Sequence, residues 1–459
     1  MASTYLNRAF SSGSVGTIAT WSFWIKRSLI GSAQFIFQTR DANNNNYRNY
    51  FRFGSTDTFD MFAYNSSGTQ ILDLRTNRVF RDTSAWYHIV IAMNTTISAT
   101  PSDRIKFYVN GVQETSFGTA TYPTHNLDIR KVSSVYTGWG QNIPNNSSFV
   151  DGSMSHINFI DGTAYDATAF GSTDSTTGEW KINTSPSVTY GTNGFFILKD
   201  GNSVTDQSPN TNNFSIGVGA GGGLSKTEDS PSNVFCTLNP LARYAANLNL
   251  SNGNNSVTET NNNWAISSST LGASTGKFYY EYKITTTASS GNAYHQLGFI
   301  SDESNGNSAS HFSASGLDGG YSFYVNNGSL EVRIDNSVIS GYDQSTLATS
   351  FTTNDIMCLA VDMTNKRVYF RKNGDAWIKS ANPVNGTNGL DISANYTAGK
   401  TMIPAVAIYY GGVGSLNFGN GYFANNPVSS AGTNASGIGI FEYDVPTGYT
   451  ALSTKGLNL

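Results

Sequence analysis

The stretch at residues 355–377, DIMCLAVDMTNKRVYFRKNGDAW, most strongly limits what this chain can fold into. Residues 356–363 form an apolar run that is too short for a buried helix, and residues 367–372 alternate charged with apolar or aromatic side chains, as a half-buried strand does. Residues 364–366 supply the turn between them, with Asn365 at the position that best tolerates a positive φ. The stretch therefore predicts a β-hairpin.

A second reversal and an upstream repeat extend this pattern. Asn373-Gly374 is a strong signal for a tight turn, so we expect a third strand near Trp377. Residues 86–113, WYHIVIAMNTTISATPSDRIKFYVNGVQ, place an apolar strand, a polar loop, an alternating strand and Asn110-Gly111 in the same order. The chain thus predicts the same strand meander twice.

The length and composition indicate two all-β domains. A chain of 459 residues is too long for one ordinary core. Charged residues make up only 13% and aromatic residues another 13%, so the segments between turns carry the bulky side chains that sheets favour. We predict an all-β fold of two antiparallel jelly-roll or β-sandwich domains in tandem: residues 1–215, a Gly/Ser/Pro linker at 216–240, and residues 241–459 with a C-terminal strand.

The charge and hydropathy patterns argue against two classes of partner. The net charge is −4 and no Lys/Arg block occurs, so the electrostatic footprint of nucleic-acid binding is missing. The longest apolar runs, such as residues 403–410, are far shorter than a membrane span, and the N-terminus lacks the features of a signal peptide. We expect no nucleic-acid binding, no membrane insertion and synthesis in a cytosol.

Segments of both domains resemble known β-sandwich families. WSFWIKR at 21–27, WYHIV at 86–90, KFYVNG at 106–111 and GSMSHINFIDG at 152–162 resemble the laminin-G or concanavalin-like lectin family over about residues 1–200. GKFYYEY at 276–282, QLGFI at 296–300, YSFY at 321–324, the hairpin, PAVA at 404–407 and GSLNFG at 414–419 follow the order of the SPRY (B30.2) family. Both resemblances imply jelly-roll-type sandwiches.

Three phrases resemble linkers in structural proteins of tailed bacteriophages. They are FGSTDSTTGEW at 170–180, NGFFIL at 193–198 and DSPSNVFCTLNP at 229–240, although such proteins more often carry a longer aromatic-rich C-terminal array. The resemblance implies a virion protein that is assembled in the cytoplasm of a bacterial host. It also implies a homo-oligomer in contact with other virion proteins.

No catalytic residue is predicted. The Gly-rich segment 217–222 lacks the helix that must follow a dinucleotide motif, and GASTG at 272–276 leads into a strand where a hydrolase places a helix. A glycosidase needs two carboxylates about 5 to 9 Å apart, which jelly-roll glucanases supply as Glu-x-Asp-x-Glu, and no such run occurs. Asp302-Glu303 lies in a predicted solvated loop. We predict that the protein is not an enzyme.

Calcium is the one cofactor that the residues leave open. The histidines are scattered and form no zinc-type cluster with cysteine. The lectin-like resemblance implies that loop aspartates can hold calcium, which makes Asp151 and Asp161, each followed by glycine, candidate ligands. The alternative is an Asp-Gly pair that only forms a turn, with no cofactor at all.

Aromatic side chains in predicted loops are the candidate ligand-binding residues. Neutral sugars stack their apolar ring faces on aromatic rings, and loops on a rigid scaffold commonly carry binding residues. The candidates are Tyr136, Trp139, Tyr294, His295 and Tyr342. For each, the alternative is an aromatic ring that covers the edge of the core.

These observations lead to three hypotheses for function. The first is a non-enzymatic tail-fibre or head-fibre protein of a phage virion that binds host-surface polysaccharide through loops on its sandwiches. The second is an architectural capsid-decoration or tail-adaptor protein that binds only other virion proteins. The third is a glycan depolymerase, which would require two carboxylates facing each other in a cleft.

Overall fold

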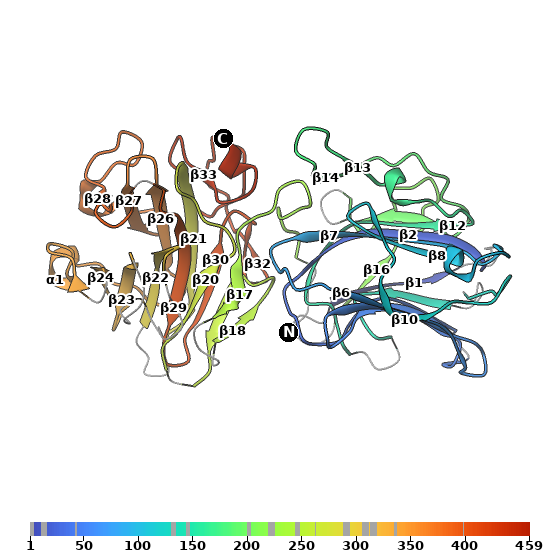
Figure 1. The fold of residues 1–459 in the computed structure, drawn as a ribbon. Helices are drawn as coiled ribbons and strands as arrows, with labels where there is room; N and C mark the ends of the chain where they lie inside the picture. The colour runs from blue at the N-terminus through green and yellow to red at the C-terminus, as the bar shows by residue number, and fades with distance from the viewer. Residues whose placement is uncertain are drawn as a thin grey trace. The chain divides into compact units, whose positions relative to one another are not determined.

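The computed structural model (Figure 1) describes residues 4–10, 16–41, 44–129, 135–143, 147–199, 203–218, 225–243, 248–261, 263–287, 294–304, 312, 319–334, 337–397 and 399–459. The chain divides into two compact units, Met1–Lys226 and Thr227–Leu459, called unit 1 and unit 2 below. Within each unit, two antiparallel sheets pack face to face (Figure 1). The predicted all-β fold of antiparallel sandwiches is confirmed.

Unit 1 contains an eight-stranded and a six-stranded sheet. The first has the order β10 (Phe117–Thr121), β6 (Gln70–Val79), β5 (Thr58–Tyr64), β4 (Arg48–Phe53), β3 (Gln34–Asp41), β11 (Val135–Trp139), β1 (Thr4–Phe10) and β16 (Ser215–Val218). The second has the order β15 (Phe195–Ile197), β12 (Gly152–Asp161), β2 (Ile18–Arg27), β7 (Trp86–Asn94), β8 (Ile105–Val109) and β9 (Val112–Glu114). A separate pair joins β13 (Gly171–Thr173) and β14 (Trp180–Ile182).

The core of unit 1 is aromatic, and Trp21 on β2 joins the two sheets. Its ring lies 5.9 Å from Phe37 and 5.2 Å from Phe51, both on the opposite sheet, and 5.4 Å from Phe159 on its own sheet. Trp21 is only 1% exposed. Alternate positions of the strands in the two large sheets face this core, and the remaining positions form the outer faces.

Unit 2 contains a seven-stranded and an eight-stranded sheet. The first has the order β17 (Leu238–Arg243), β20 (Ala265–Ser269), β29 (Met402–Ile408), β22 (Tyr294–Ser301), β23 (Tyr321–Asn326), β24 (Ser329–Ile334) and β25 (Ser337–Val338). The second has the order β18 (Leu248–Ser251), β19 (Ser256–Glu259), β30 (Val413–Asn417), β21 (Lys277–Thr286), β26 (Ile356–Asp362), β27 (Arg367–Lys372) and β28 (Leu390–Asp391), with β33 (Thr450–Ala451) parallel to β21. A short pair joins β31 (Tyr422–Phe423) and β32 (Asn426–Pro427).

Among the residues that the structure describes, helical structure is confined to single turns. These are η1 (Pro101–Arg104), η2 (Ala167–Ala169), α1 (Gln344–Leu347), η3 (Ile378–Ser380) and η4 (Gly456–Asn458). Within the described residues, no helix has the length and apolar character needed to cross a membrane.

The predicted three-strand meander is confirmed in full in unit 1 and in part in unit 2. β7, β8 and β9 follow the predicted order, and Asn110 and Gly111 both take positive φ at the tight turn. In unit 2, Lys366 (φ 54°) takes the positive φ that was expected at Asn365. The third strand, β28, begins at Leu390, because a 3-10 turn follows Trp377 in place of the expected strand. Each meander extends its sheet from a long central strand, β2 or β21, to an edge.

Both ends of the predicted linker at residues 216–240 belong to the units in the structure, which corrects the linker boundaries. β16 adds to the edge of unit 1 by pairing with β1. At the other end, Phe235 and Cys236 are each 1% exposed in the cores of unit 2, and the Cys236 N–H donates to the carbonyl of Leu452. Strand pairing holds β16 in unit 1, and burial of Phe235 and Cys236 holds the second segment in unit 2, which the Gly-rich composition between them obscured.

The sheet-to-sheet role of Trp21 predicts a large stability effect. Trp21→Ala should lower the free energy of unfolding by roughly 3–5 kcal/mol, because the truncated side chain leaves a cavity lined by aromatic rings. Urea-induced unfolding of the full-length protein measures this loss. The control is Val112→Thr on the edge strand β9, where the side chain is 66% exposed, and it should change stability by no more than about 0.5 kcal/mol. Equal losses in the two variants would contradict the role of Trp21.

Candidate functional site

Each of three neighbouring strands in unit 2 places one aromatic ring at the same end of the seven-stranded sheet. Trp264 precedes β20, Tyr409 follows β29 and Tyr294 begins β22, and the register of these strands places the three residues side by side. The ring of Tyr409 stacks on Trp264 with centroids 5.2 Å apart and meets Tyr294 edge to face at 5.7 Å. The three rings form a continuous row on the outer face of the sheet.

Two further tyrosines widen this row. Tyr410 stacks on Tyr409 at 5.5 Å, and Tyr324 on β23 meets the edge of Trp264 at 5.5 Å. We call Trp264, Tyr294, Tyr324, Tyr409 and Tyr410 the aromatic platform. Tyr324 is 8% exposed, and the other four side chains are partly exposed, so their rings reach solvent.

Polar groups border the platform without placing a free charge on it. The Tyr294 hydroxyl donates to Asn327 Oδ1 at 3.3 Å. The Arg333 guanidinium lies 5.2 Å from the centre of the Tyr324 ring and is paired with Glu331 at 2.6 Å. Burial raises the pKa of Tyr324 to about 12, so its phenol is neutral at physiological pH. The site therefore offers aromatic surface with neutral hydrogen-bonding groups at its rim.

A buried carboxylate, Glu259 at the end of β19, holds the two loops that carry the platform. Its Oε1 accepts the Asn261 N–H at 2.5 Å and the Asn263 N–H at 3.3 Å, just before Trp264. Its Oε2 accepts the Gly411 N–H at 2.8 Å, just after the two loop tyrosines. Glu259 is 1% exposed. The Glu259 side chain thus fixes both the loop before Trp264 and the loop after Tyr410.

The outer face of the eight-stranded sheet of unit 1 carries a second aromatic layer, but arginines cover it. Tyr50 lies between Phe35 and Phe62, with ring centroids 4.9 and 5.0 Å away. The guanidinium carbons of Arg52 and Arg75 each lie 5.0 Å from the centre of the Phe62 ring. Phe62 is only 2% exposed. These rings support the arginines and do not present a stacking surface of their own.

Two described carboxylates of this face, Asp60 and Asp73, are held in ion pairs. Asp60 accepts from Arg52 Nε at 3.0 Å, and Asp73 accepts from both Nε and Nη2 of Arg75 at 2.9 Å. A glycosidase requires one carboxylic acid that keeps its proton in an apolar environment opposite a second carboxylate. Two carboxylates that are each bonded to an arginine do not provide this arrangement.

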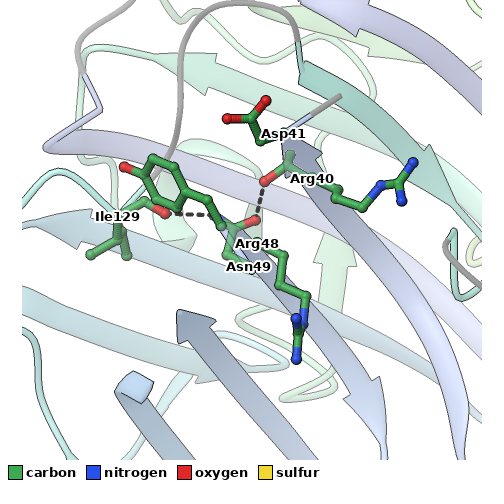
Figure 2. Close-up of a pocket in the computed structure, with 7 residues that line it drawn as sticks. Arg40, Asp41, Arg48, Asn49 and Ile129 are labelled. Carbon is green, nitrogen blue, oxygen red and sulfur yellow. Dashed lines mark hydrogen bonds between the residues drawn. The ribbon is translucent and has the colours of Figure 1, made fainter. Parts of the chain in front are cut away.

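A shallow pocket lies at one end of β3 and β4, lined by Thr39, Arg40, Asp41, Tyr47, Arg48, Asn49 and Ile129 (Figure 2). Asn49 Nδ2 donates to the Ile129 carbonyl at 3.2 Å, and Asn49 Oδ1 accepts from the Thr39 hydroxyl. Figure 2 shows the side chains of Arg40 and Arg48 extending away from Asn49. The pocket has no enclosed space large enough for a water molecule, so it does not account for ligand binding by itself.

Two of the residues predicted from the sequence lie in the core and not in binding loops. Trp139 is the last residue of β11, is 1% exposed and contacts Phe23 and Phe37 at 5.4 and 4.7 Å. His295 on β22 is 0% exposed, receives a hydrogen bond from the Tyr282 hydroxyl at Nδ1 (2.7 Å) and lies 3.2 Å from the Thr286 carbonyl through Nε2. A fully buried ring cannot stack on a ligand from solvent, so the expected loop positions are corrected.

The other predicted aromatic residues have different surroundings. Tyr294 belongs to the aromatic platform. Tyr342 packs on Phe370 at 6.1 Å, and the ammonium of Lys379 lies 4.5 Å from its ring centre, so much of its surface is already covered. Tyr136 lies in β11 by its backbone, and its side chain falls outside the described part of the structure.

The two candidate calcium ligands cannot share one ion. Asp151 directly precedes β12 and Asp161 is its last residue, so about 30 Å of extended chain separates them. Asp161 Oδ2 accepts the Asn193 N–H at 3.1 Å, and burial raises the pKa of Asp151. Within the described residues, no group of three or more His, Cys, Asp or Glu side chains is arranged to hold a metal.

The sequence interpretation missed most of the aromatic platform. Trp264 and the pair Tyr409-Tyr410 stand at the ends of apolar strand patterns, where a core position is the usual expectation. The available signal was an aromatic residue beside a polar run, NNNW at 261–264 and YYGG at 409–412. That signal does not reveal that these ends lie next to each other, because strand register is not encoded locally.

Comparison with known proteins bears mainly on unit 1. Residues 4–169 match the family model of the concanavalin A-like lectin/glucanases superfamily. Unit 1 is similar to concanavalin A-like lectins. No curated protein matches the chain.

Solved structures similar to the chain include SPRY domains and a pentraxin. The SPRY domain of human HERC1 has 18% identity, covering 39% of this chain and 96% of that chain, with a TM-score of 0.29. The TRIM65 PSpry domain has 11% identity, covering 40% and 91%, with a TM-score of 0.26. The heptameric SAP-like pentraxin from Limulus polyphemus has 15% identity, covering 35% and 71%, with a TM-score of 0.27. Because these TM-scores are low, the architecture described above is based on the strand pairing of this chain alone.

The burial of His295 predicts a loss of stability in acid. Burial lowers its pKa to about 4, from an ordinary value of 6.5, so between these values the unfolded chain binds a proton that the folded chain does not. The stabilisation is complete above pH 6.5 and is lost as the pH falls toward 4, by roughly 3 kcal/mol. Urea unfolding at several pH values measures the slope, which His295→Gln should reduce. An unchanged slope in the variant would contradict the assignment.

Proposed function

We propose that this protein binds carbohydrate without cleaving it, and that the aromatic platform of unit 2 is the binding surface. The observation that carries the proposal is the row of Trp264, Tyr409 and Tyr294, whose rings are packed against one another and still reach solvent. The lectin-like match of residues 4–169 supports a binding function for the chain as a whole. It concerns unit 1 and does not identify the platform.

The chemistry of the platform fits a neutral sugar. Apolar faces of pyranose rings lose hydration when they pack on aromatic rings, and the rings here are pre-packed, so little side-chain freedom is lost on binding. The Tyr294 hydroxyl and the Asn327 amide lie at the rim, where they can exchange their mutual hydrogen bond for bonds to sugar hydroxyls. Specific orientation then comes from these few polar groups.

We further propose that the protein is a structural component of a tailed-bacteriophage virion, in a tail fibre or head fibre, that attaches to host-surface polysaccharide. The three linker phrases at 170–180, 193–198 and 229–240 support this part of the proposal. Such a protein would assemble in the bacterial cytoplasm as a homo-oligomer with other virion proteins. Many copies on one particle raise the avidity of individually modest sites.

An architectural role is the second candidate, and one edge of unit 1 favours it. β16 lies at the end of the eight-stranded sheet, with Ile216 46% and Val218 55% exposed. An exposed apolar edge strand is a surface on which another chain can add a strand. In that case the protein would bind other virion proteins and would show no affinity for polysaccharide.

Replacement of Trp264 tests the carbohydrate proposal. Trp264→Ala should weaken binding of the labelled full-length protein to arrayed neutral bacterial polysaccharides by at least about tenfold, because it removes the largest ring of the platform. The control is Trp377→Ala, which alters the other tryptophan of unit 2, where Arg371 lies over the ring at 4.6 Å. A parallel arm with a chelator tests the expectation of calcium at Asp151 and Asp161. No binding by the folded wild type would reject the proposal and favour the architectural role.

Glu259 provides a second test that leaves every ring in place. Glu259→Gln should weaken polysaccharide binding by about tenfold, because an amide oxygen can accept from only one of the two loops that the carboxylate now holds. Affinity and thermal stability are measured together. Glu442→Gln is the matched control, since that carboxylate bonds only to the exposed Ser429 among the described contacts. Wild-type affinity in Glu259→Gln would show that the loops do not depend on this carboxylate.

A further inference from the structure

The tight turn between β29 and β30, residues 409–412, breaks a sequence rule at one residue of the aromatic platform. The Gly412 N–H donates to the Tyr409 carbonyl at 3.3 Å. The two residues between them, Tyr410 and Gly411, take φ of 59° and 75°. Positive φ at both central positions is the pattern of a type I′ turn, which favours Asn, Asp or Gly at the first of them. Tyrosine at this position is therefore an exception.

The tyrosine strains the backbone of this turn. In the left-handed region the Cβ atom comes too close to the following carbonyl oxygen, and a bulky residue rarely adopts it. Elsewhere the chain obeys the turn rule, since Asn110-Gly111 and Asn327-Gly328 both take positive φ. Strained residues persist only where the surrounding structure holds them, and they gather at functional sites. The strain at Tyr410 thus needs a physical reason.

Core packing does not supply that reason. Tyr410 is partly exposed, and the buried hydrophobic clusters of the described part of unit 2 do not include it. Among the described rings, Tyr410 contacts Tyr409 alone, with centroids 5.5 Å apart and planes inclined by 29°. Tyr409 in turn stacks on Trp264, with planes inclined by 24°. Tyr410 is thus the exposed end of a stacked series of three rings.

Glu259 holds the strained turn through both its side chain and its main chain. Its Oε2 accepts the Gly411 N–H at 2.8 Å, and its own backbone N–H donates to the Gly412 carbonyl at 3.2 Å. Hydrogen bonds to a carboxylate are stronger than those between neutral groups. The same carboxylate also accepts from the loop before Trp264. Both ends of the stacked series are therefore fixed before a ligand binds.

We propose that Tyr410 is the principal sugar-contacting residue of the platform, and that its strained turn is retained because it presents the ring face to the ligand. The apolar face of a pyranose ring packs on the tyrosine ring and extends the stacked series by one ring. A ring that is already held loses little conformational freedom on binding, which favours affinity. The inference rests on the proposed function and deepens it, because it names the contact and the backbone conformation on which affinity depends.

The test replaces the tyrosine with a residue that the turn favours. Tyr410→Asn removes the ring but fits positive φ, so the full-length protein should unfold no more than about 2 °C below the wild type. Biolayer interferometry measures affinity for the arrayed neutral polysaccharide that the wild type binds most tightly, and this affinity should fall at least about tenfold. A smaller loss of affinity, or a larger fall in unfolding temperature, would overturn the proposal.

Two further variants separate the ring from the turn. Tyr410→Phe keeps the ring face and should keep most of the affinity, because the proposed contact is with the ring and not with the hydroxyl. Ala424→Asn makes a turn-favouring change between β31 and β32, where Ala424 takes a φ of 55°, and should leave affinity unchanged. A loss in either variant equal to that in Tyr410→Asn would contradict the role of the ring face.

Comparison with Trp264→Ala separates this inference from the proposed function. Loss of binding in both variants, with the stability of Tyr410→Asn preserved, is the expected result. If Trp264→Ala loses binding and Tyr410→Asn retains it, the platform remains the binding surface and the role of Tyr410 is rejected. If the folded wild type binds no arrayed polysaccharide, the proposed function fails and the role of Tyr410 fails with it.

Discussion

The packing of aromatic side chains between two sheets is the interaction on which both units depend. In unit 1, Trp21 reaches across to Phe37 and Phe51. In unit 2, Phe323 of one sheet lies 4.5 Å from Phe370 of the other. Burial of such large apolar surfaces is the dominant favourable term in folding, and it is satisfied from one face of each strand. Outward-facing positions that no further segment covers are then available for function.

The outer faces of the two units carry different side chains. In unit 2, the platform rings are left partly exposed, and the buried carboxylate of Glu259 fixes the loops around them. In unit 1, arginines lie on the rings, and Phe62 is almost fully sheltered. The first surface presents aromatic rings to solvent, and the second presents arginines that are paired with Asp60 and Asp73. The same kind of sandwich thus carries two different surfaces, because the fold alone does not decide which residues lie on its outer faces.

The repeated meander shows how far local sequence can predict structure. In both units it joins the strand next to a long central strand to the edge of its sheet. Asn110-Gly111 forms the expected tight turn, because both residues tolerate positive φ. Lys366 takes the positive φ in place of Asn365, and the chain does not re-enter the sheet at Trp377. In this second meander the turn at Asn373-Gly374 forms, with Asn373 at φ 50°, but residues 378–389 run outside the sheet before β28 rejoins it.

The sequence by itself determined the alternation, the turns and hence the all-β class, since these depend on residues within a few positions of one another. It also identified Tyr294 as a candidate for ligand binding. Only the tertiary structure decided that Trp264 and Tyr409 lie beside Tyr294, that Trp139 and His295 are buried, and that Arg40 lies opposite Arg48. The physical reason is that which residues share a sheet face depends on strand order and register. Most of these pairings join strands far apart in the chain, so no local pattern specifies them.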